Sequence, residues 1–144
     1  MLLEEEMTLT AKHNAKSILV VEDDADNREL YTQAFALLTP YHVQVVRNGP
    51  QALHFVKHIK PNVFILDYRL PGMNGIELYD LLHATPGLEE IPAIIISSIT
   101  SEEAAHEIES RNLLRIDKPF DLDVLFNAIK EVLAWLTSSE SNRR

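Results

Sequence analysis

The sequence contains no cysteine, which excludes a disulfide framework, a thiol nucleophile and a metal site built from thiolates. No apolar run approaches the roughly 20 residues that a membrane-spanning helix requires, and nothing resembles a signal peptide. Basic residues are the minority, since 13 Lys and Arg face 22 Asp and Glu for a formal net charge of −9. That balance argues against a nucleic-acid surface, because phosphates are bound by basic faces. We therefore expect a soluble, cytoplasmic protein that binds neither membranes nor nucleic acid.

The length of 144 residues predicts one domain, large enough to bury roughly 70% of its unfolded surface. Residues 1–16 carry charged and polar side chains without sustained periodicity, which is typical of a flexible N-terminal extension. Residues 137–144 are expected to form a polar C-terminal tail. The folded domain is therefore predicted over residues 17–136.

Five short apolar runs, bounded by residues that break regular structure, predict buried β-strands. They span residues 17–21, 41–46, 63–67, 93–97 and 113–117. Helical spacing and capping residues predict five helices between and after them. These run from a cap at Asp26 or Asn27 to Pro40, from Gly49-Pro50 to Pro61, over 76–83, over 101–109, and from Asp121 to Leu136. Strands alternating with helices predict a doubly wound α/β sandwich with an all-parallel sheet.

Apolar stripes should place the first two helices and the last on the sheet. The expected inward residues are Leu30, Tyr31, Ala34, Leu37 and Leu38, then Ala52, Leu53, Val56 and Ile59, and finally Leu122, Leu125, Ile129, Val132 and Leu133.

The third strand ends in a single carboxylate, Asp67, and the chain then turns through Pro71-Gly72 and Asn74-Gly75. In open α/β sheets the carboxyl ends of the strands line the ligand-binding crevice. A lone Asp after a strand also commonly caps the next turn. The companions of Asp67 at the other strand ends therefore decide its interpretation.

Those companions are Glu22 and Asp23 after the first strand, Ser97 at the end of the fourth and Lys118 after the fifth. Each pair of nearby carboxylates repels by about 4 kcal/mol at ~4 Å with an effective dielectric near 20. Either their pKa values rise or a cation neutralises them, and an all-oxygen donor set favours Mg²⁺. A metal-free, hydrogen-bonded cluster is the alternative. The added ammonium and hydroxyl favour phosphoryl chemistry, in which a carboxylate attacks phosphorus to form an acyl phosphate.

With these residues the chain resembles the receiver domain of two-component response regulators, over residues ~17–136. Four motifs carry the resemblance, each weak alone but specific in this order and spacing. They are Val20-Val21-Glu22-Asp23, Leu66-Asp67 with Pro71-Gly72-Met73-Asn74-Gly75, Pro92 to Ser98, and Lys118-Pro119-Phe120. The resemblance implies a flavodoxin-like fold with strand order 2-1-3-4-5.

It also implies roles for the site residues. Asp67 would be the phosphoacceptor, with Ser97 as the switch hydroxyl and Lys118 as the phosphoryl-binding ammonium. Mg²⁺ would be held directly by Asp23, with Asp67 and the backbone carbonyl of Arg69 as further ligands and Glu22 as a ligand through a water molecule. The Lys118-Pro119 bond would be cis, and Asp24 is expected to be a loop or cap residue.

The function expected from the resemblance is that of a stand-alone phosphoacceptor domain. It would take a phosphoryl group from a histidine kinase or histidine phosphotransfer protein and signal to an unknown downstream protein by contact. It would catalyse its own phosphorylation and slow dephosphorylation but would not otherwise be an enzyme.

One departure from the family leaves a second interpretation open. Arg115 stands where the family usually carries Tyr or Phe, and strand alternation predicts that it faces outward, near Glu102, Glu103 or Glu107. This favours an adaptor that keeps the fold without using phosphorylation, whereas the complete acidic set and Lys118 argue against it. A third interpretation is a haloacid-dehalogenase-type phosphatase, which also uses an Asp after a strand. That family requires a second Asp two residues later, where this chain has Arg69.

Overall fold

The computed structural model describes residues 15–98 and 101–142, with side chains described as far as residue 136. The predicted N-terminal extension therefore lies outside the described residues except for Ala15 and Lys16. The side chains of the predicted C-terminal tail lie outside them as well. Within the described ranges, no helix combines the length and apolar character needed to cross a membrane.

Five parallel strands form one sheet in the order β2-β1-β3-β4-β5, which confirms the predicted doubly wound, flavodoxin-like fold. Their bounds are β1 Ser17–Val21, β2 His42–Val46, β3 Val63–Asp67, β4 Ala93–Ser97 and β5 Leu114–Asp117. Every residue of β3 and β4 is buried, because helices cover both faces of the sheet.

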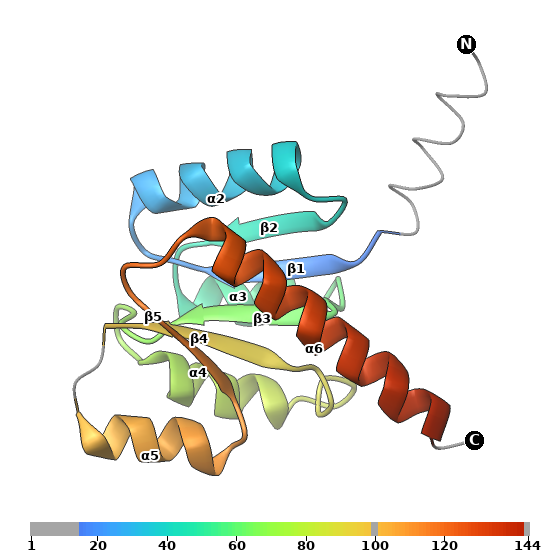
Figure 1. Ribbon diagram of the computed structural model, residues 1–144. Coiled ribbons are helices and arrows are strands. Elements are labelled where there is room, and N and C mark those ends of the chain that lie inside the picture. The colour runs from blue at the N-terminus through green and yellow to red at the C-terminus, as the bar shows by residue number, and fades with distance from the viewer. Residues whose placement is uncertain (1–14, 99–100, 143–144) are drawn as a thin grey trace.

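The helices are α2 Ala25–Leu38, α3 Gly49–Phe55, α4 Gly75–His83, α5 Glu102–Ser110 and α6 Leu122–Asn142. Helices α2 and α6 cover one face of the sheet, and α3, α4 and α5 cover the other (Figure 1). The core is accordingly split in two by the sheet. Phe35 of α2 meets Phe126 of α6 edge-to-face at a ring distance of 5.2 Å, which joins the two helices of the first layer.

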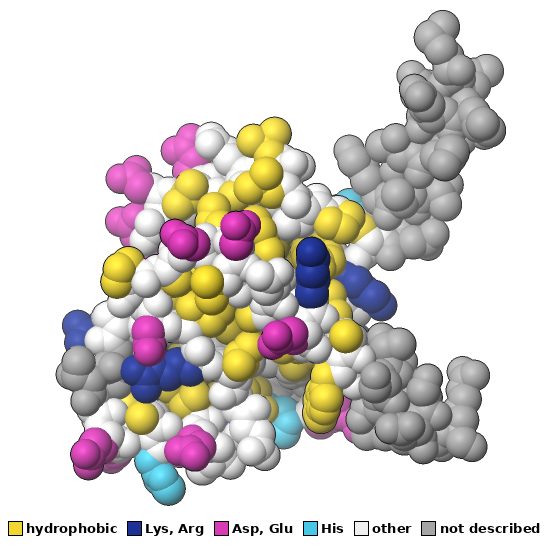
Figure 2. All heavy atoms as spheres, in the orientation of Figure 1, with side chains coloured by type: hydrophobic (Ala, Val, Ile, Leu, Met, Phe, Trp, Pro, Cys, Tyr) yellow, Lys and Arg dark blue, Asp and Glu magenta, His cyan; other side chains and the backbone are white. Residues whose placement is uncertain are grey.

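The apolar stripe expected on α2 is wrong in part. Tyr31 and Ala34 are buried as predicted, but the third buried residue of this helix is Phe35. Leu30, Leu37 and Leu38 are exposed instead, Leu37 by 82%, and apolar side chains are visible over α2 in Figure 2. The helix carries more apolar residues than its contact with the sheet can cover. Composition alone therefore does not identify the inward face.

Helix α3 ends at Phe55, earlier than predicted. The next amides bond three residues back, with Lys57 N–H on His54 O and His58 N–H on Phe55 O, so the chain tightens into turns. Of the expected stripe, Ala52 is buried and Val56 packs against the core beyond the helix end, whereas Ile59 is exposed.

Helix α6 confirms its predicted inward residues. Leu125 and Ile129 are buried, and Leu122, Val132 and Leu133 pack against the same core. The helix continues to Asn142, beyond the predicted end at Leu136. No Pro or Gly interrupts this stretch, so nothing in the sequence stops it.

Candidate functional site

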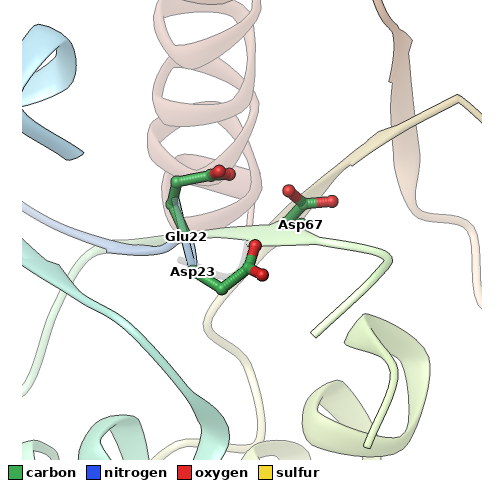
Figure 3. A group of neighbouring side chains, drawn as sticks. All are labelled: Glu22, Asp23 and Asp67. Atoms are coloured by element: carbon green, nitrogen blue, oxygen red, sulfur yellow. The ribbon is translucent and has the colours of Figure 1, made fainter. Parts of the chain in front are cut away.

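Three acidic side chains meet at the carboxyl edge of the sheet. Asp67 is the last residue of β3, and Glu22 and Asp23 directly follow β1, its hydrogen-bonded neighbour. One carboxylate oxygen from each of the three lies within 4.8 Å of the other two. Figure 3 shows Glu22 and Asp23 extending from the end of β1 toward Asp67. The sequence prediction that these residues converge is confirmed.

Glu22 and Asp67 are 3% and 5% exposed, whereas Asp23 is exposed. Burial, followed by a hydrogen bond to Asp67, raises the pKa of Glu22 from 4.5 to about 7, and the charge of Asp67 acts in the same direction. A cation bound among these oxygens would favour the ionised form of Glu22 and so lower its pKa. Because the donors are all carboxylate oxygens, the site fits Mg²⁺.

Lys118 completes the site from the other side. Its Nζ donates a hydrogen bond to Asp67 Oδ2 at 2.8 Å, and its backbone N–H donates to the carbonyl of Ser97 at 2.8 Å. Burial alone would lower the pKa of Lys118, but the hydrogen bond and charge of Asp67, with the charges of Glu22 and Asp23, raise it overall. The Lys118-Pro119 peptide bond is cis, as predicted.

Ser97 ends β4, next to the strand that carries Asp67, and its side chain is buried. Its neighbour in the register on the other side is Asp117, the residue before Lys118. The residue predicted to be the switch therefore ends β4, the strand between β3, which carries Asp67, and β5, which Lys118 directly follows.

The turn after β3 packs tightly under Asp67. The backbone N–H of Arg69 donates to Asp67 Oδ1 at 3.2 Å, and the N–H of Gly75 donates to the Tyr68 carbonyl at 2.8 Å. A Cβ on Gly75 would lie 2.5 Å from the carbonyl oxygen of Asp67. A capping box between Asn74 and Glu77 starts α4 at this point. Glycine is therefore required at position 75, because the backbone at the start of α4 lies directly against the backbone at the end of β3.

The first turn of α2 holds the acidic pair, which the sequence analysis did not foresee. Asp24 is the N-cap, one of the two roles expected for it, so the cap predicted at Asp26 or Asn27 is wrong. Its Oδ2 accepts the N–H of Asn27 at 2.9 Å. This frees the side chain of Asn27, whose Nδ2 donates to Glu22 Oε1 at 3.1 Å. Arg28 donates from Nη1 to the carbonyls of Glu22 at 3.1 Å and Asp23 at 2.6 Å. The available signal was a pair of side-chain donors one helical turn after two adjacent acids.

Arg115 lies on β5 with its side chain 27% exposed and bonds from Nε to Asp117 Oδ1 at 2.6 Å. Arg115 points away from this core, as strand alternation predicts, since its neighbour Ile116 packs into the core of the α2 and α6 layer. The ion pair described for Arg115 is with Asp117 and not with the expected Glu102, Glu103 or Glu107 of α5. Asp117 is two residues along the same strand and so lies on the same side, within reach of the guanidinium.

The sequence model of the "Response regulator receiver domain" matches residues 18–130. The chain is 31% identical over 119 residues to the sporulation initiation phosphotransferase F of Bacillus subtilis, covering 82% of this chain and 94% of that protein. It is 36% identical over 104 residues to a protein-glutamate methylesterase/protein-glutamine glutaminase of Bacillus licheniformis, covering 69% of this chain but only 28% of that protein.

Among solved structures, the signal receiver domain of a signal transduction histidine kinase from Syntrophus aciditrophicus superposes with a TM-score of 0.75. It is 28% identical, and the match covers 83% of this chain and 91% of that one. A CheY-like receiver domain protein from Methanospirillum hungatei gives a TM-score of 0.79 at 24% identity, covering 88% and 99%, and shows the shared fold.

Proposed function

Because the chain belongs to the response regulator receiver domain family, we propose that it accepts a phosphoryl group on Asp67 in a two-component system or phosphorelay. The observation that carries this proposal is the 2.8 Å hydrogen bond from Lys118 to a carboxylate that also lies within the acidic cluster. A carboxylate that could act as the nucleophile, an ammonium bonded to it and a set of oxygens that could bind a cation thus share one edge of the sheet.

The donor would be a phosphohistidine of a histidine kinase or histidine phosphotransfer protein. A carboxylate oxygen of Asp67 attacks phosphorus, the new O–P bond forms, and the P–N bond breaks with its electron pair leaving on the imidazole. The Lys118 ammonium, which bonds to Asp67, would bind an oxygen of the transferred group, and the hydroxyl of Ser97 would donate to another. The relative named a phosphotransferase supports this class of reaction.

Glu22, Asp23, Asp67 and the carbonyl of Arg69 would hold Mg²⁺. When bound, the ion would neutralise negative charge shared by the carboxylates and the phosphoryl oxygens. The chain's own contribution is to pre-arrange the oxygens, since the turn after β3 and the first turn of α2 fix the backbone at both strand ends.

Beyond its own phosphorylation and slow hydrolysis, the domain would catalyse nothing, and it would signal in the cytoplasm through contact with a downstream protein. The phosphorylation-independent adaptor is the second candidate. One observation favours it, namely the ion pair that holds Arg115 on Asp117 where the family usually carries an aromatic ring.

The deciding experiment is incubation of the protein with acetyl phosphate, with and without Mg²⁺, followed by intact mass spectrometry. We expect one phosphoryl adduct that requires Mg²⁺. The matched control is Asp67→Asn, an isosteric amide that is a poor nucleophile. Absence of an adduct on the wild type would favour the adaptor, and an undiminished adduct on Asp67→Asn would move the phosphoacceptor elsewhere.

A further inference from the structure

We propose that Asn27 is a positioning residue for metal binding, whose side-chain amide orients the Glu22 carboxylate within the acidic cluster. The inference rests on the proposed function, because it concerns the Mg²⁺ that phosphorylation would require. Its basis is the hydrogen bond from Asn27 Nδ2 to Glu22 Oε1 at 3.1 Å.

The same oxygen of Glu22 has a second donor. The backbone N–H of Asp24 reaches Glu22 Oε1 at 3.3 Å, so two donors from the start of α2 converge on one carboxylate oxygen. Glu22 is buried, so bulk water has little access to replace a lost donor. Two bonds on one oxygen limit rotation of the carboxylate and leave its direction toward the cluster defined.

The Asn27 amide is itself held on a rigid support. Its backbone N–H is bound by the N-cap carboxylate of Asp24 at 2.9 Å. The next residue, Arg28, fixes the backbone carbonyls of Glu22 and Asp23 from the same helical turn. Arg28 therefore holds the backbone of the acidic pair, whereas Asn27 holds one side chain. This division makes the contribution of Asn27 separable from that of the loop.

Asn27 can also be changed without damage to the fold. Its side chain is exposed, and alanine has a higher helix propensity than asparagine at such a position. Loss of a hydrogen bond that orients a metal-ligating carboxylate commonly weakens metal binding by about 10- to 100-fold. Because Asp24 N–H still holds Glu22, we expect a loss near the lower limit, about tenfold.

The test compares wild type, Asn27→Ala and Gln33→Ala by isothermal titration calorimetry with MgCl₂. Gln33 is the matched control, since its amide lies on the same helix and bonds Glu29, away from the site. We expect Asn27→Ala to bind Mg²⁺ about tenfold more weakly and Gln33→Ala to bind as wild type does. With acetyl phosphate, Asn27→Ala should need about tenfold more Mg²⁺ but reach nearly the wild-type rate at saturation.

The same change in the Glu22→Ala background separates positioning from other effects. Without the carboxylate that it orients, Asn27→Ala should cause no further loss of Mg²⁺ affinity. An equal loss in both backgrounds, or wild-type affinity in Asn27→Ala, would overturn the inference while leaving the proposed function in place. A wild-type protein that neither binds Mg²⁺ nor becomes phosphorylated would overturn both.

Discussion

Lys118 and Asp67 are 51 residues apart in the chain and are joined by a 2.8 Å hydrogen bond between Nζ and Oδ2. Asp67 ends β3 and Lys118 directly follows β5; the two strands are separated by β4, whose last residue accepts the Lys118 backbone N–H. Lys118 is thus held by both its backbone and its side chain. This contact brings the Lys118 ammonium against the cluster of Glu22, Asp23 and Asp67. The stability of the protein should therefore depend on mutation of these residues, on bound metal and on pH.

Asp67→Asn should leave the metal-free protein no less stable than wild type at neutral pH. The substitution removes the repulsion between Asp67 and Glu22, while the amide oxygen can still accept from Lys118.

Lys118→Met should instead destabilise the protein by about 1–3 kcal/mol, because it leaves the buried carboxylate of Asp67 without its charged donor. Urea unfolding in EDTA measures both. A loss exceeding about 1 kcal/mol in Asp67→Asn would contradict this account.

Millimolar Mg²⁺ should raise the melting temperature of the wild-type protein. A ligand that binds only the folded state stabilises it by about 2.7 kcal/mol at a hundredfold excess over its Kd. Asp23→Ala should lose most of that shift, because it removes one of the three clustered oxygen ligands. Asp26→Ala is the control, since Asp26 is an exposed acid of α2 outside the cluster. Equal shifts in wild type and Asp23→Ala would exclude Asp23 as a ligand.

The metal-free protein should lose stability as the pH rises from about 4.5 to about 7 through Glu22. Because its pKa is raised on folding, the folded protein retains a proton in this interval that the unfolded chain has released, so increasing pH favours unfolding. The full effect is at most about 3 kcal/mol.

Glu22→Gln should remove that dependence. In EDTA the free energy of unfolding of Glu22→Gln, relative to that of wild type, should be higher at about pH 8 than at about pH 5. Denaturant unfolding at the two pH values measures this difference. Parallel curves for the two proteins would show that Glu22 titrates normally.

Gly75→Ala should destabilise the protein by about 1–3 kcal/mol and slow phosphorylation, since the new methyl would press on the Asp67 carbonyl at 2.5 Å. Backbone cannot move aside as a side chain can. Gly49→Ala is the comparison, because there the nearest atom is the flexible end of Met73 at 2.7 Å. We expect Gly49→Ala to be tolerated. Thermal unfolding and acetyl phosphate labelling of both variants test the contrast.

Arg115 should remain on the surface in the activated state. Burying a guanidinium without a partner costs several kcal/mol, so it cannot take the inward path of an aromatic ring. Its pair with Asp117, which is 68% exposed, should contribute no more than about 1 kcal/mol, as Arg115→Ala will measure. A crystal structure with beryllofluoride decides the conformation. A guanidinium swung into the core beside Ser97 would refute the prediction.

The strand and helix order follows from the sequence alone, because short stretches rich in β-branched and other apolar residues alternate with stretches of helical spacing. Val63–Asp67 shows why this works: a fully buried strand needs apolar residues throughout, so its carboxylate stands out. Glu22, Asp23 and Lys118 could be identified in the same way, since parallel strands bring their carboxyl ends to one edge.

What required the tertiary structure were the contacts that depend on helix rotation and side-chain direction. Which apolar residues of α2 face the sheet was decided by packing of Phe35 against Phe126, at the expense of Leu37 and Leu38. The bond from Asn27 to Glu22 arises because Asp24 takes the N-cap position, a choice among several adjacent polar residues that local propensity cannot rank. Sequence therefore determined which groups reach the site, and three-dimensional packing determined how they are held there.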